Sequence, residues 1–212
     1  MGDIKKLAVL VSGNGSNLQS IIDSINIGEI NANISLVISN IETAFALTRA
    51  KKENLNCAFL NHKNFSSRES FDQALGELLI KREVDLIVLA GFMRILSNSF
   101  IEKFNKKIIN IHPSLLPKYP GLKTHEKVMN NKDKYHGATI HLVDEGLDSG
   151  PIIAQARFKA AKYKDMNSLI TKVHSIEHKL YPLIIKMIVE GEINLNELNG
   201  KNFKLYEDEF DF

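Results

Sequence analysis

The sequence contains little that would mark a secreted, membrane-bound or nucleic-acid-binding protein. It has a single cysteine, Cys57, which excludes an intramolecular disulfide. Its apolar runs are short, and the first one ends at Ser12, so we expect neither a signal peptide nor a membrane span. The net charge is only +2, with 27 basic and 25 acidic residues dispersed along the chain, so we expect no nucleic-acid partner. These features fit a cytoplasmic protein that binds small molecules, as a monomer or a homodimer.

Metal-binding and repeat patterns are also missing. No mixed cluster of cysteine and histidine stands out, so we expect no metal site. The chain shows no internal repeat, linker or low-complexity tract. With 212 residues it is long enough for one sizeable α/β domain and short for two. We therefore expect one domain over residues 1–212.

Apolar strand-like runs alternate with amphipathic helix-like runs along the chain. This pattern predicts an α/β fold with a doubly wound, mostly parallel central sheet of about seven strands and helices on both faces. The predicted strands are residues 7–12, 34–39, 57–60, 85–90, 108–112, 138–143 and 152–158. The predicted helices are residues 16–26, 43–53, 68–82, 97–104, 124–131 and 166–190. Pro182 should kink or divide the last helix, and the tail from Asn194 to Phe212 either packs on the sheet edge or frays.

A glycine-rich loop, Ser12-Gly-Asn-Gly-Ser-Asn17, follows the first predicted strand. Ser16-x-x-Gln19 has the form of a capping box, which predicts that a helix starts near Ser16. The free amides of Gly15, Ser16 and Asn17 would form an anion site at the positive end of that helix. The loop lacks the Lys-Ser/Thr pair of a Walker motif and the third glycine of a dinucleotide fingerprint, so we predict a single phosphate monoester as the ligand. A tight connection without a ligand is the alternative.

A second polar group of residues follows the apolar segment that starts at Ile108. Side chains alternate along a strand, so Asn110 and His112 project to the same side. An amide can donate a hydrogen bond to a developing alkoxide while an imidazole donates another and moves a proton, which suits attack on a carbonyl. In a doubly wound fold this pair and the glycine-rich loop would border one cleft beyond the carboxyl ends of the strands. The simpler alternative is that Asn110 caps a turn and His112 is structural.

Four motifs resemble, in order and spacing, those of the phosphoribosylglycinamide formyltransferases, a family of folate-dependent formyltransferases. They are Ser12-Gly-Asn-Gly-Ser-Asn-Leu18, Leu89-Ala-Gly-Phe-Met-Arg-Ile-Leu96, Ile109-Asn-Ile-His-Pro-Ser-Leu-Leu-Pro-Lys-Tyr-Pro-Gly121 and Leu147-Asp-Ser-Gly-Pro-Ile152. The resemblance spans nearly the whole chain. Other 10-formyltetrahydrofolate enzymes share the His-Pro-Ser-Leu-Leu-Pro and Asp-x-Gly-Pro blocks, so these blocks specify the formyl chemistry, whereas the glycine-rich loop specifies the acceptor.

The resemblance implies transfer of a formyl group from the co-substrate 10-formyltetrahydrofolate to the amine of glycinamide ribonucleotide, in the third step of de novo purine biosynthesis. It assigns the oxyanion to Asn110 and His112, and it implies that Asp148 keeps His112 cationic. The N-terminal half would bind the phosphate, and the C-terminal half would bind folate and hold the catalytic residues. As an alternative, Asp148 could serve only to form a turn.

The family's binding positions can be carried over to this sequence. The acceptor would contact Gly15, Ser16 and Asn17 with its phosphate and Glu177 with its ribose, although Glu177 could also be an exposed helix charge. The residues implied for folate binding are Arg68, Met93, Arg94, Ile95, Leu96, Asn110, His141, Asp144 and Glu145. The 93–96 segment could instead be an ordinary loop in which Met93 and Ile95 are core residues and Arg94 is solvated, and Arg68 could be a solvated charge.

Three other functions share part of this pattern. Methionyl-tRNA formyltransferase and formyltetrahydrofolate deformylase would need an additional domain, for which we expect no room in 212 residues. The deformylase remains an alternative because it shares the formyl chemistry. A non-catalytic phosphosugar or folate sensor is the alternative from another class. The joint presence of Asn110, His112 and Asp148 disfavours a sensor, since binding alone does not require all three.

Overall fold

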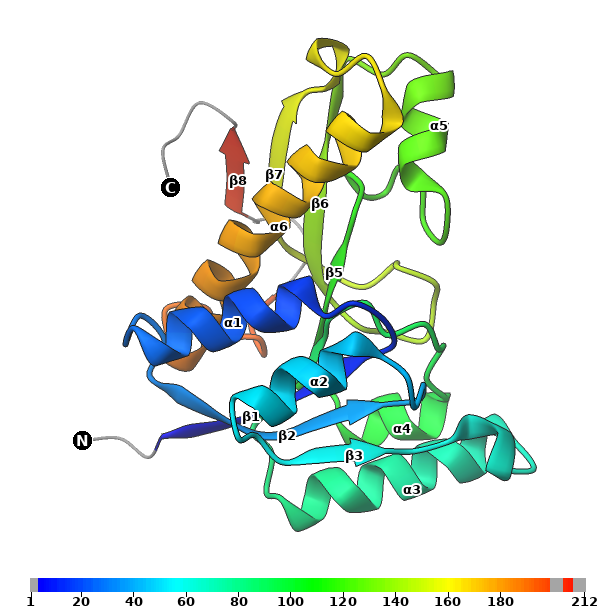
Figure 1. Cartoon of the computed structure of the whole chain (residues 1–212), viewed down its shortest axis with the longest axis vertical. Coiled ribbons are helices and arrows are strands. Elements are labelled where there is room, and N and C mark those ends of the chain that lie inside the picture. The colour runs from blue at the N-terminus through cyan, green and yellow to red at the C-terminus, as the bar shows by residue number, and fades with distance from the viewer. Residues whose placement is uncertain (1–3, 199–203, 208–212) are drawn as a thin grey trace.

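The computed structural model describes residues 4–198 and 204–207, in which eight strands form one sheet in the order β3-β2-β1-β4-β5-β6-β7-β8 (Figure 1). The strands are β1 (Lys5–Val11), β2 (Ala32–Ser39), β3 (Cys57–Phe59), β4 (Leu86–Leu89), β5 (Ile108–His112), β6 (Tyr135–Leu142), β7 (Ile152–Lys159) and β8 (Lys204–Glu207). β6 runs antiparallel to β5 and β7, and the other neighbouring pairs are parallel.

Helices cover both faces of this sheet. The α-helices are α1 (Ser16–Asn26), α2 (Phe45–Lys52), α3 (Arg68–Lys81), α4 (Asn98–Lys103), α5 (Thr124–Asn130) and α6 (Met166–Val189), and the 3-10 helices are η1 (His62–Asn64) and η2 (Ala160–Lys162). In Figure 1, α1 and α2 lie on one side of β1 to β3, and α3 lies on the other.

The alternation of side chains along β1 explains this layering. Leu7 and Val9 belong to the apolar core shared with α1, α2 and α6, whereas Ala8 and Leu10 belong to the core shared with α3 and α4. Because all four side chains are fully buried, both faces of the strand must be apolar. A near-continuous apolar run such as residues 7–11 is the sequence pattern of a strand in the centre of a parallel sheet.

The order of the strands places a crevice at the carboxyl end of β1. The chain moves outward from β1 to β2 and β3, then returns to β4 on the other side of β1 and continues to β5. The loops that follow β1 and β4 therefore diverge at this point, which is where ligands bind in doubly wound sheets. The two loops are joined directly, since the Ser12 amide donates to the Gly91 carbonyl at 3.1 Å.

The predicted fold class is confirmed. β8 adds a strand to the seven expected, and because it pairs with β7 at the edge of the sheet, the described part of the tail packs on the sheet edge, one of the two expected outcomes. Helix α6 continues past Pro182, so the expected division of this helix does not occur. The N-cap of α1 is Gly15 in a left-handed conformation (φ 76°), with no side-chain cap, so the expected capping box at Ser16 does not form.

Helix α6 is anchored to the sheet by one buried hydroxyl. Tyr181 is fully buried, and its Oη lies 2.9 Å from the Leu89 carbonyl and 3.2 Å from the Ile109 carbonyl. One proton can be donated to either oxygen, so the hydroxyl links α6 to both β4 and β5. These are the two strands whose ends bear the 93–96 segment and Asn110.

We predict that Tyr181→Phe lowers the free energy of unfolding by roughly 1 to 3 kcal/mol, because the carbonyls lose a buried donor while the ring is kept. Urea denaturation measures this change. Tyr163→Phe is the control, since its hydroxyl has no hydrogen-bond partner among the described residues, and it should change stability by less than about 0.5 kcal/mol. Equal losses in the two variants would contradict the anchoring role.

Candidate functional site

Asn110 and His112 lie on one face of β5, as the strand prediction requires. The antiparallel register of β5 and β6 places His141 opposite Asn110 and Thr139 opposite His112. Paired residues face the same side of a sheet, so the two histidines and the amide come together. The Asn110 side-chain amide lies 3.2 Å from Nε2 of His141.

Asp148 completes this group, which we call the carboxylate–histidine cluster (Asn110, His112, His141 and Asp148). Its Oδ2 lies 3.3 Å from Nδ1 of His112, and its Oδ1 lies 3.6 Å from Nε2 of His141. The Gly121 amide donates to Oδ2 at 2.8 Å. Asp148 has a positive φ of 51°, a left-handed conformation that Asp tolerates in turns. Asp148 therefore adopts a turn conformation and also contacts His112, so it does not serve only to form a turn.

Backbone carbonyls fix the tautomers of the two imidazoles. His112 Nε2 lies 2.9 Å from the Tyr119 carbonyl, and a carbonyl only accepts, so Nε2 bears the proton of the neutral ring. His141 Nδ1 donates likewise to the Leu142 carbonyl at 2.7 Å. The neutral His141 ring then accepts from Asn110 through Nε2. In His112, Nδ1 is the ring nitrogen free to gain a proton.

The resting charge of His112 differs from the sequence-based expectation. Burial lowers the pKa of His112 below its ordinary value, and the Tyr119 carbonyl and the Asp148 carboxylate raise it without outweighing burial. Burial raises the pKa of Asp148, but its contact with His141, the hydrogen bond from the Gly121 amide and the charge of His112 hold it below its ordinary value. The expected resting imidazolium is therefore wrong for the free protein, which pairs a charged Asp148 with a His112 poised to accept a proton.

The glycine-rich loop lies between β1 and α1, and its geometry requires glycine at position 15. A Cβ on Gly15 would lie 2.5 Å from Cβ of Ala46 in α2, and the positive φ is itself strained for other residues. Because Gly15 supplies no side-chain cap, the first amides of α1, including those of Ser16 and Asn17, are not capped by a side chain. An anion could accept from these N–H groups at the positive helix end.

Glu177 links this loop to α6. The Asn17 side-chain amide donates to Oε2 of Glu177 at 3.2 Å, and the carboxyl is 4% exposed. Burial raises the pKa of Glu177 to about 7, and the hydrogen bond from Asn17 opposes this change. The alternative of an exposed helix charge is therefore wrong. At neutral pH this carboxyl is poised between donating and accepting hydrogen bonds.

The 93–96 segment follows β4 and lies beside the glycine-rich loop. Ser12 Oγ donates to Asn40 at 2.6 Å and accepts from the Met93 amide at 2.8 Å, so one serine joins the two loops. Met93 is 69% exposed and Ile95 is 58% exposed, whereas Leu96 is buried. The alternative that placed Met93 and Ile95 in the core is wrong, and their exposed apolar side chains are available to a ligand.

The charged residues expected to bind folate each contact a different local partner. Arg94 lies over the Phe71 ring at 4.8 Å, and Arg68 pairs with Glu69 at 3.6 Å. Asp144 accepts from the Gly146 amide and from Ser149, and Glu145 accepts from Asn98. Within residues 4–198 and 204–207, none of Arg68, Arg94, Asp144 and Glu145 forms a hydrogen bond or ion pair with the carboxylate–histidine cluster.

Sequence reasoning missed several residues that shape the site. The Tyr119 carbonyl could not be assigned to His112, because the contact depends on how the 113–120 loop returns to β5. The role of Ser12 in joining two loops also depends on a long-range contact that its motif does not show. His174 and His178 on α6 have His-x-x-x-His spacing, and their rings stack 6.1 Å apart. The part of the chain that is described contains no group of three or more possible ligand side chains placed to hold a metal ion.

A buried histidine pair lies near the cluster. His125 Nδ1 and His136 Nε2 are 2.9 Å apart, and His136 is 1% exposed. Burial and, to a smaller extent, the charge of His174 lower the pKa of His125 to about 4. Burial likewise lowers the pKa of His136 to about 3, with His125 adding to the effect. Both rings are neutral near pH 7, so one can donate to the other.

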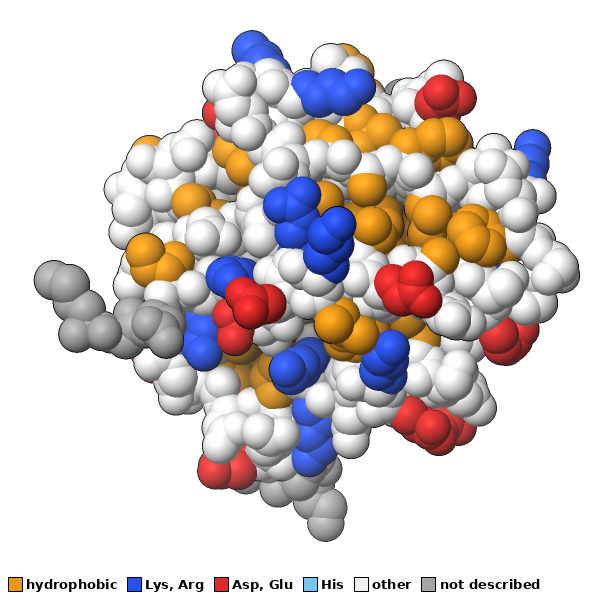
Figure 2. All heavy atoms as spheres, turned by 90° about the horizontal axis from the view of Figure 1, so that it is seen from below, with side chains coloured by type: hydrophobic (Ala, Val, Ile, Leu, Met, Phe, Trp, Pro, Cys, Tyr) orange, Lys and Arg blue, Asp and Glu red, His pale blue; other side chains and the backbone are white. Residues whose placement is uncertain are grey.

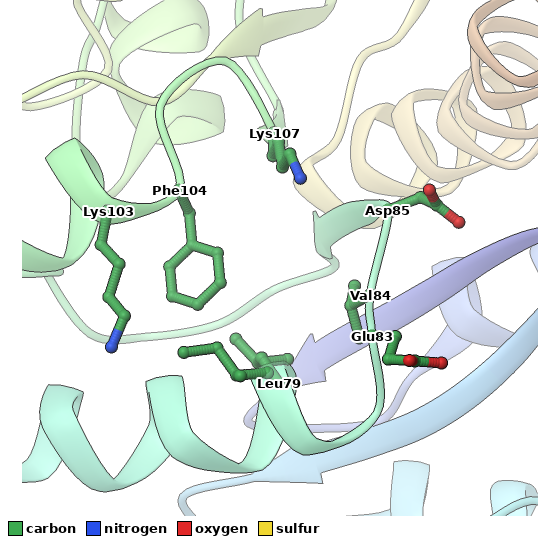
Figure 3. Close-up of a pocket in the computed structure, with 8 residues that line it drawn as sticks. Leu79, Glu83, Val84, Asp85, Lys103, Phe104 and Lys107 are labelled. Carbon is green, nitrogen blue, oxygen red and sulfur yellow. The ribbon is translucent and has the colours of Figure 1, made fainter.

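A shallow hollow of about 420 Å³ opens at the opposite end of the sheet (Figure 3). Val84 and Asp85 precede β4 and Lys107 precedes β5, so the hollow lies at the amino ends of these strands. Its acids already have partners, since Glu83 pairs with Lys6 and Asp85 with Lys5. On the face shown in Figure 2, Lys and Arg side chains are interleaved with Asp and Glu rather than gathered in one patch. Neither feature competes with the site at the carboxyl ends.

Comparison with known proteins agrees with the geometry. A family model described as formyl transferase matches residues 5–185. The phosphoribosylglycinamide formyltransferase of Haemophilus influenzae is 44% identical over 202 residues, which cover 93% of this chain and 95% of the relative. That of Escherichia coli is 41% identical over 191 residues, 90% of each chain. A solved structure of the Coxiella burnetii phosphoribosylglycinamide formyltransferase superposes with a TM-score of 0.90 at 38% identity, covering 96% of this chain and all of that one. Among the described helices, none is long and apolar enough to cross a membrane.

We predict that acid destabilises the fold through His136. The unfolded ring binds a proton near its ordinary pKa of about 6.5, whereas the folded ring resists protonation until a pKa of about 3, so stability is full above that range and is lost as pH falls. Between about pH 7 and about pH 4, the wild type should lose on the order of 3 kcal/mol more than His136→Gln, which does not titrate. Urea denaturation at both pH values gives the two losses, and equal losses would show that His136 is not buried as a neutral ring.

Proposed function

Because the chain belongs to the formyl transferase family, we propose that it transfers the formyl group of 10-formyltetrahydrofolate to the primary amine of glycinamide ribonucleotide. The products would be formylglycinamide ribonucleotide and tetrahydrofolate, as in the third step of de novo purine biosynthesis. The observation that supports this most is the carboxylate–histidine cluster at the carboxyl end of β5, in the same fold region as a glycine-rich loop with uncapped amides. Carbonyl chemistry and a phosphate site are the two parts that this reaction requires.

The two substrates would occupy different halves of one formyltransferase domain. In the N-terminal half, Gly15, Ser16 and Asn17 would hold the phosphate, and Glu177 from α6 would bind the ribose hydroxyls. A carboxyl with a pKa of about 7 can donate to one hydroxyl when protonated or accept from two when ionised. This property suits a neutral diol next to a phosphate.

The folate would bind in the C-terminal half. The exposed apolar side chains of Met93 and Ile95 and the backbone up to Leu96 would line the pterin pocket, beside Asn110 and His141. The turn that contains Asp144 and Glu145 would close over the ring. Arg94 would contribute its backbone to the pterin pocket, and Arg68 would pair with the glutamate carboxylate, for which a guanidinium fork is well suited.

The residues of the cluster define the order of proton transfers. The acceptor amine attacks the formyl carbon, and the Asn110 amide donates a hydrogen bond to the oxyanion that forms. Neutral His112 accepts the proton that the amine loses, through Nδ1, and Asp148 stabilises the resulting imidazolium. His112 then donates to the same oxyanion and gives its proton to the departing folate nitrogen. Because the pKa of His112 is lowered in the free protein, the ring is neutral before the amine attacks and can first act as a base.

The rival deformylase activity uses water as the acceptor, so dependence on the second substrate separates the two. With 10-formyltetrahydrofolate alone, the purified protein should release tetrahydrofolate very slowly, and glycinamide ribonucleotide should accelerate release at least ~100-fold. Absorbance of the folate product measures both rates. Equal rates with and without the acceptor would favour the deformylase, and no turnover with bound ligands would favour a sensor. We place the activity in the cytoplasm, in a monomer or homodimer.

We predict that Asn110→Ala depresses turnover by roughly a hundred-fold or more, the scale for losing one oxyanion donor, with dissociation constants of both substrates nearly unchanged. Asn26→Ala, which removes an exposed amide bonded to Glu53 away from the site, serves as the control and should leave turnover within about threefold. Because Asn110 and His112 serve one oxyanion, the double variant should lose less than the product of the single losses. If Asn110→Ala mainly abolished folate binding, the residue would hold the ligand rather than stabilise the tetrahedral state.

A further inference from the structure

The guanidinium of Arg49, on α2, forms hydrogen bonds to the glycine-rich loop and to α1. Its Nε donates to the Asn14 carbonyl at 2.9 Å, and its Nη2 donates to the Asn14 side chain at 3.0 Å. Nη1 donates to Gln19 of α1 at 3.3 Å, and the guanidinium lies 4.9 Å from the Phe45 ring centroid. One planar group therefore holds both the backbone and the side chain at the middle of the loop.

The first turn of α2 forms the wall behind the same loop. The Ala46 amide donates to the Gly13 carbonyl at 3.1 Å, and Cβ of Ala46 is the atom that excludes any side chain at Gly15. Arg49 lies one turn further along this helix and adds two hydrogen bonds to Asn14. The 13–15 segment is thus bonded to α2 on one side, and its direction into α1 is fixed.

The charge of Arg49 has no acidic partner. Among residues 4–198 and 204–207, no carboxylate forms an ion pair with Arg49, and its three hydrogen bonds go to neutral oxygens. Burial lowers the pKa of His178 on α6, and the charges of His174 and Arg49 lower it further. The positive charge of Arg49 therefore acts on a residue of α6, the helix that bears Glu177. A partly buried, uncompensated guanidinium beside free helix amides is suited to complement an anion.

We infer that Arg49 is a positioning residue for the phosphate of the acceptor: its fork on Asn14 holds the glycine-rich loop in the conformation in which the amides of Gly15, Ser16 and Asn17 converge on the anion. This inference rests on the proposed function. The fork requires two nitrogens in one plane, which a lysine cannot supply. Arg49 would act on the acceptor alone, because it makes no contact with the 93–96 segment or with the carboxylate–histidine cluster in the described residues.

A purely structural role would be to clamp α2 onto α1 through Gln19. The two roles differ in what each variant changes. Arg49→Gln and Arg49→Lys both lose the fork on Asn14, and Arg49→Lys keeps the charge. Gln19→Ala loses the link between the helices and keeps the fork, and Lys52→Gln removes an exposed charge from the same helix.

The experiment measures the Michaelis constants for both substrates, together with calorimetric binding of ribose 5-phosphate and of ribose as the phosphate-free comparison. Arg49→Gln and Arg49→Lys should each raise the Michaelis constant for glycinamide ribonucleotide and the dissociation constant for ribose 5-phosphate by roughly tenfold or more. The Michaelis constant for 10-formyltetrahydrofolate and the turnover number should stay within about twofold. Gln19→Ala and Lys52→Gln should resemble the wild type in all four quantities, and thermal melts of every variant report folding.

Several outcomes would overturn the inference. Wild-type behaviour of Arg49→Lys would show that only charge matters, and equal changes for both substrates would show a general structural role, as would a matching defect in Gln19→Ala. If the wild type does not use glycinamide ribonucleotide but loses ribose 5-phosphate binding on Arg49→Gln, the proposed function fails and the positioning role stands. If the wild type uses glycinamide ribonucleotide and Arg49→Gln leaves its Michaelis constant unchanged, only the positioning role fails.

Discussion

The contact between the Asp148 carboxylate and two imidazoles is the interaction on which the candidate site depends. Asp148 reaches His112 and His141 at once because the register of β5 and β6 places the two histidines on one face and the turn at 143–151 returns above them. The carboxylate is largely buried, and its contact with His141 and the hydrogen bond from the Gly121 amide favour its ionised form. A buried charge of this kind needs a partner, so protonation of His112 during the reaction satisfies both groups. The free-energy cost of burying the Asp148 carboxylate is therefore offset more fully when His112 is protonated than when His112 is neutral.

The fold brings this chemistry next to the acceptor site by two linked contacts. Tyr181 fixes α6 to the ends of β4 and β5, and one turn earlier on the same helix Glu177 accepts from Asn17 in the first turn of α1. Ser12 joins the glycine-rich loop to the 93–96 segment. The ends of β1, β4 and β5 are therefore held relative to one another by hydrogen bonds between elements that are distant in sequence, which is how a rigid scaffold supports a site built on connections.

Local patterns in the sequence were sufficient for most of the fold, and long-range contacts explain what was missed. The apolar runs and amphipathic periods predicted seven of the eight described strands, and alternation along β5 alone placed Asn110 and His112 on one face. The short strand β8 lies in a tail without clear period, and its pairing with β7 is a tertiary contact. Gly15 replaced the expected serine cap because Ala46, distant in sequence, leaves no room for a side chain. The expectation of a cationic His112 was wrong because the sequence motifs show its partner Asp148 but not the burial, which lowers the pKa of His112 more than Asp148 raises it.

The proposed mechanism requires that His112 is neutral in the free protein and that Asp148 favours its protonated form. Titration of the His112 ring by NMR in the free wild type and in Asp148→Asn measures both properties. We expect a wild-type pKa below the ordinary value of about 6.5, because burial outweighs the carboxylate, and a still lower pKa in the variant. A wild-type pKa above about 6.5, or the same pKa in both proteins, would show that these two residues do not interact in this way.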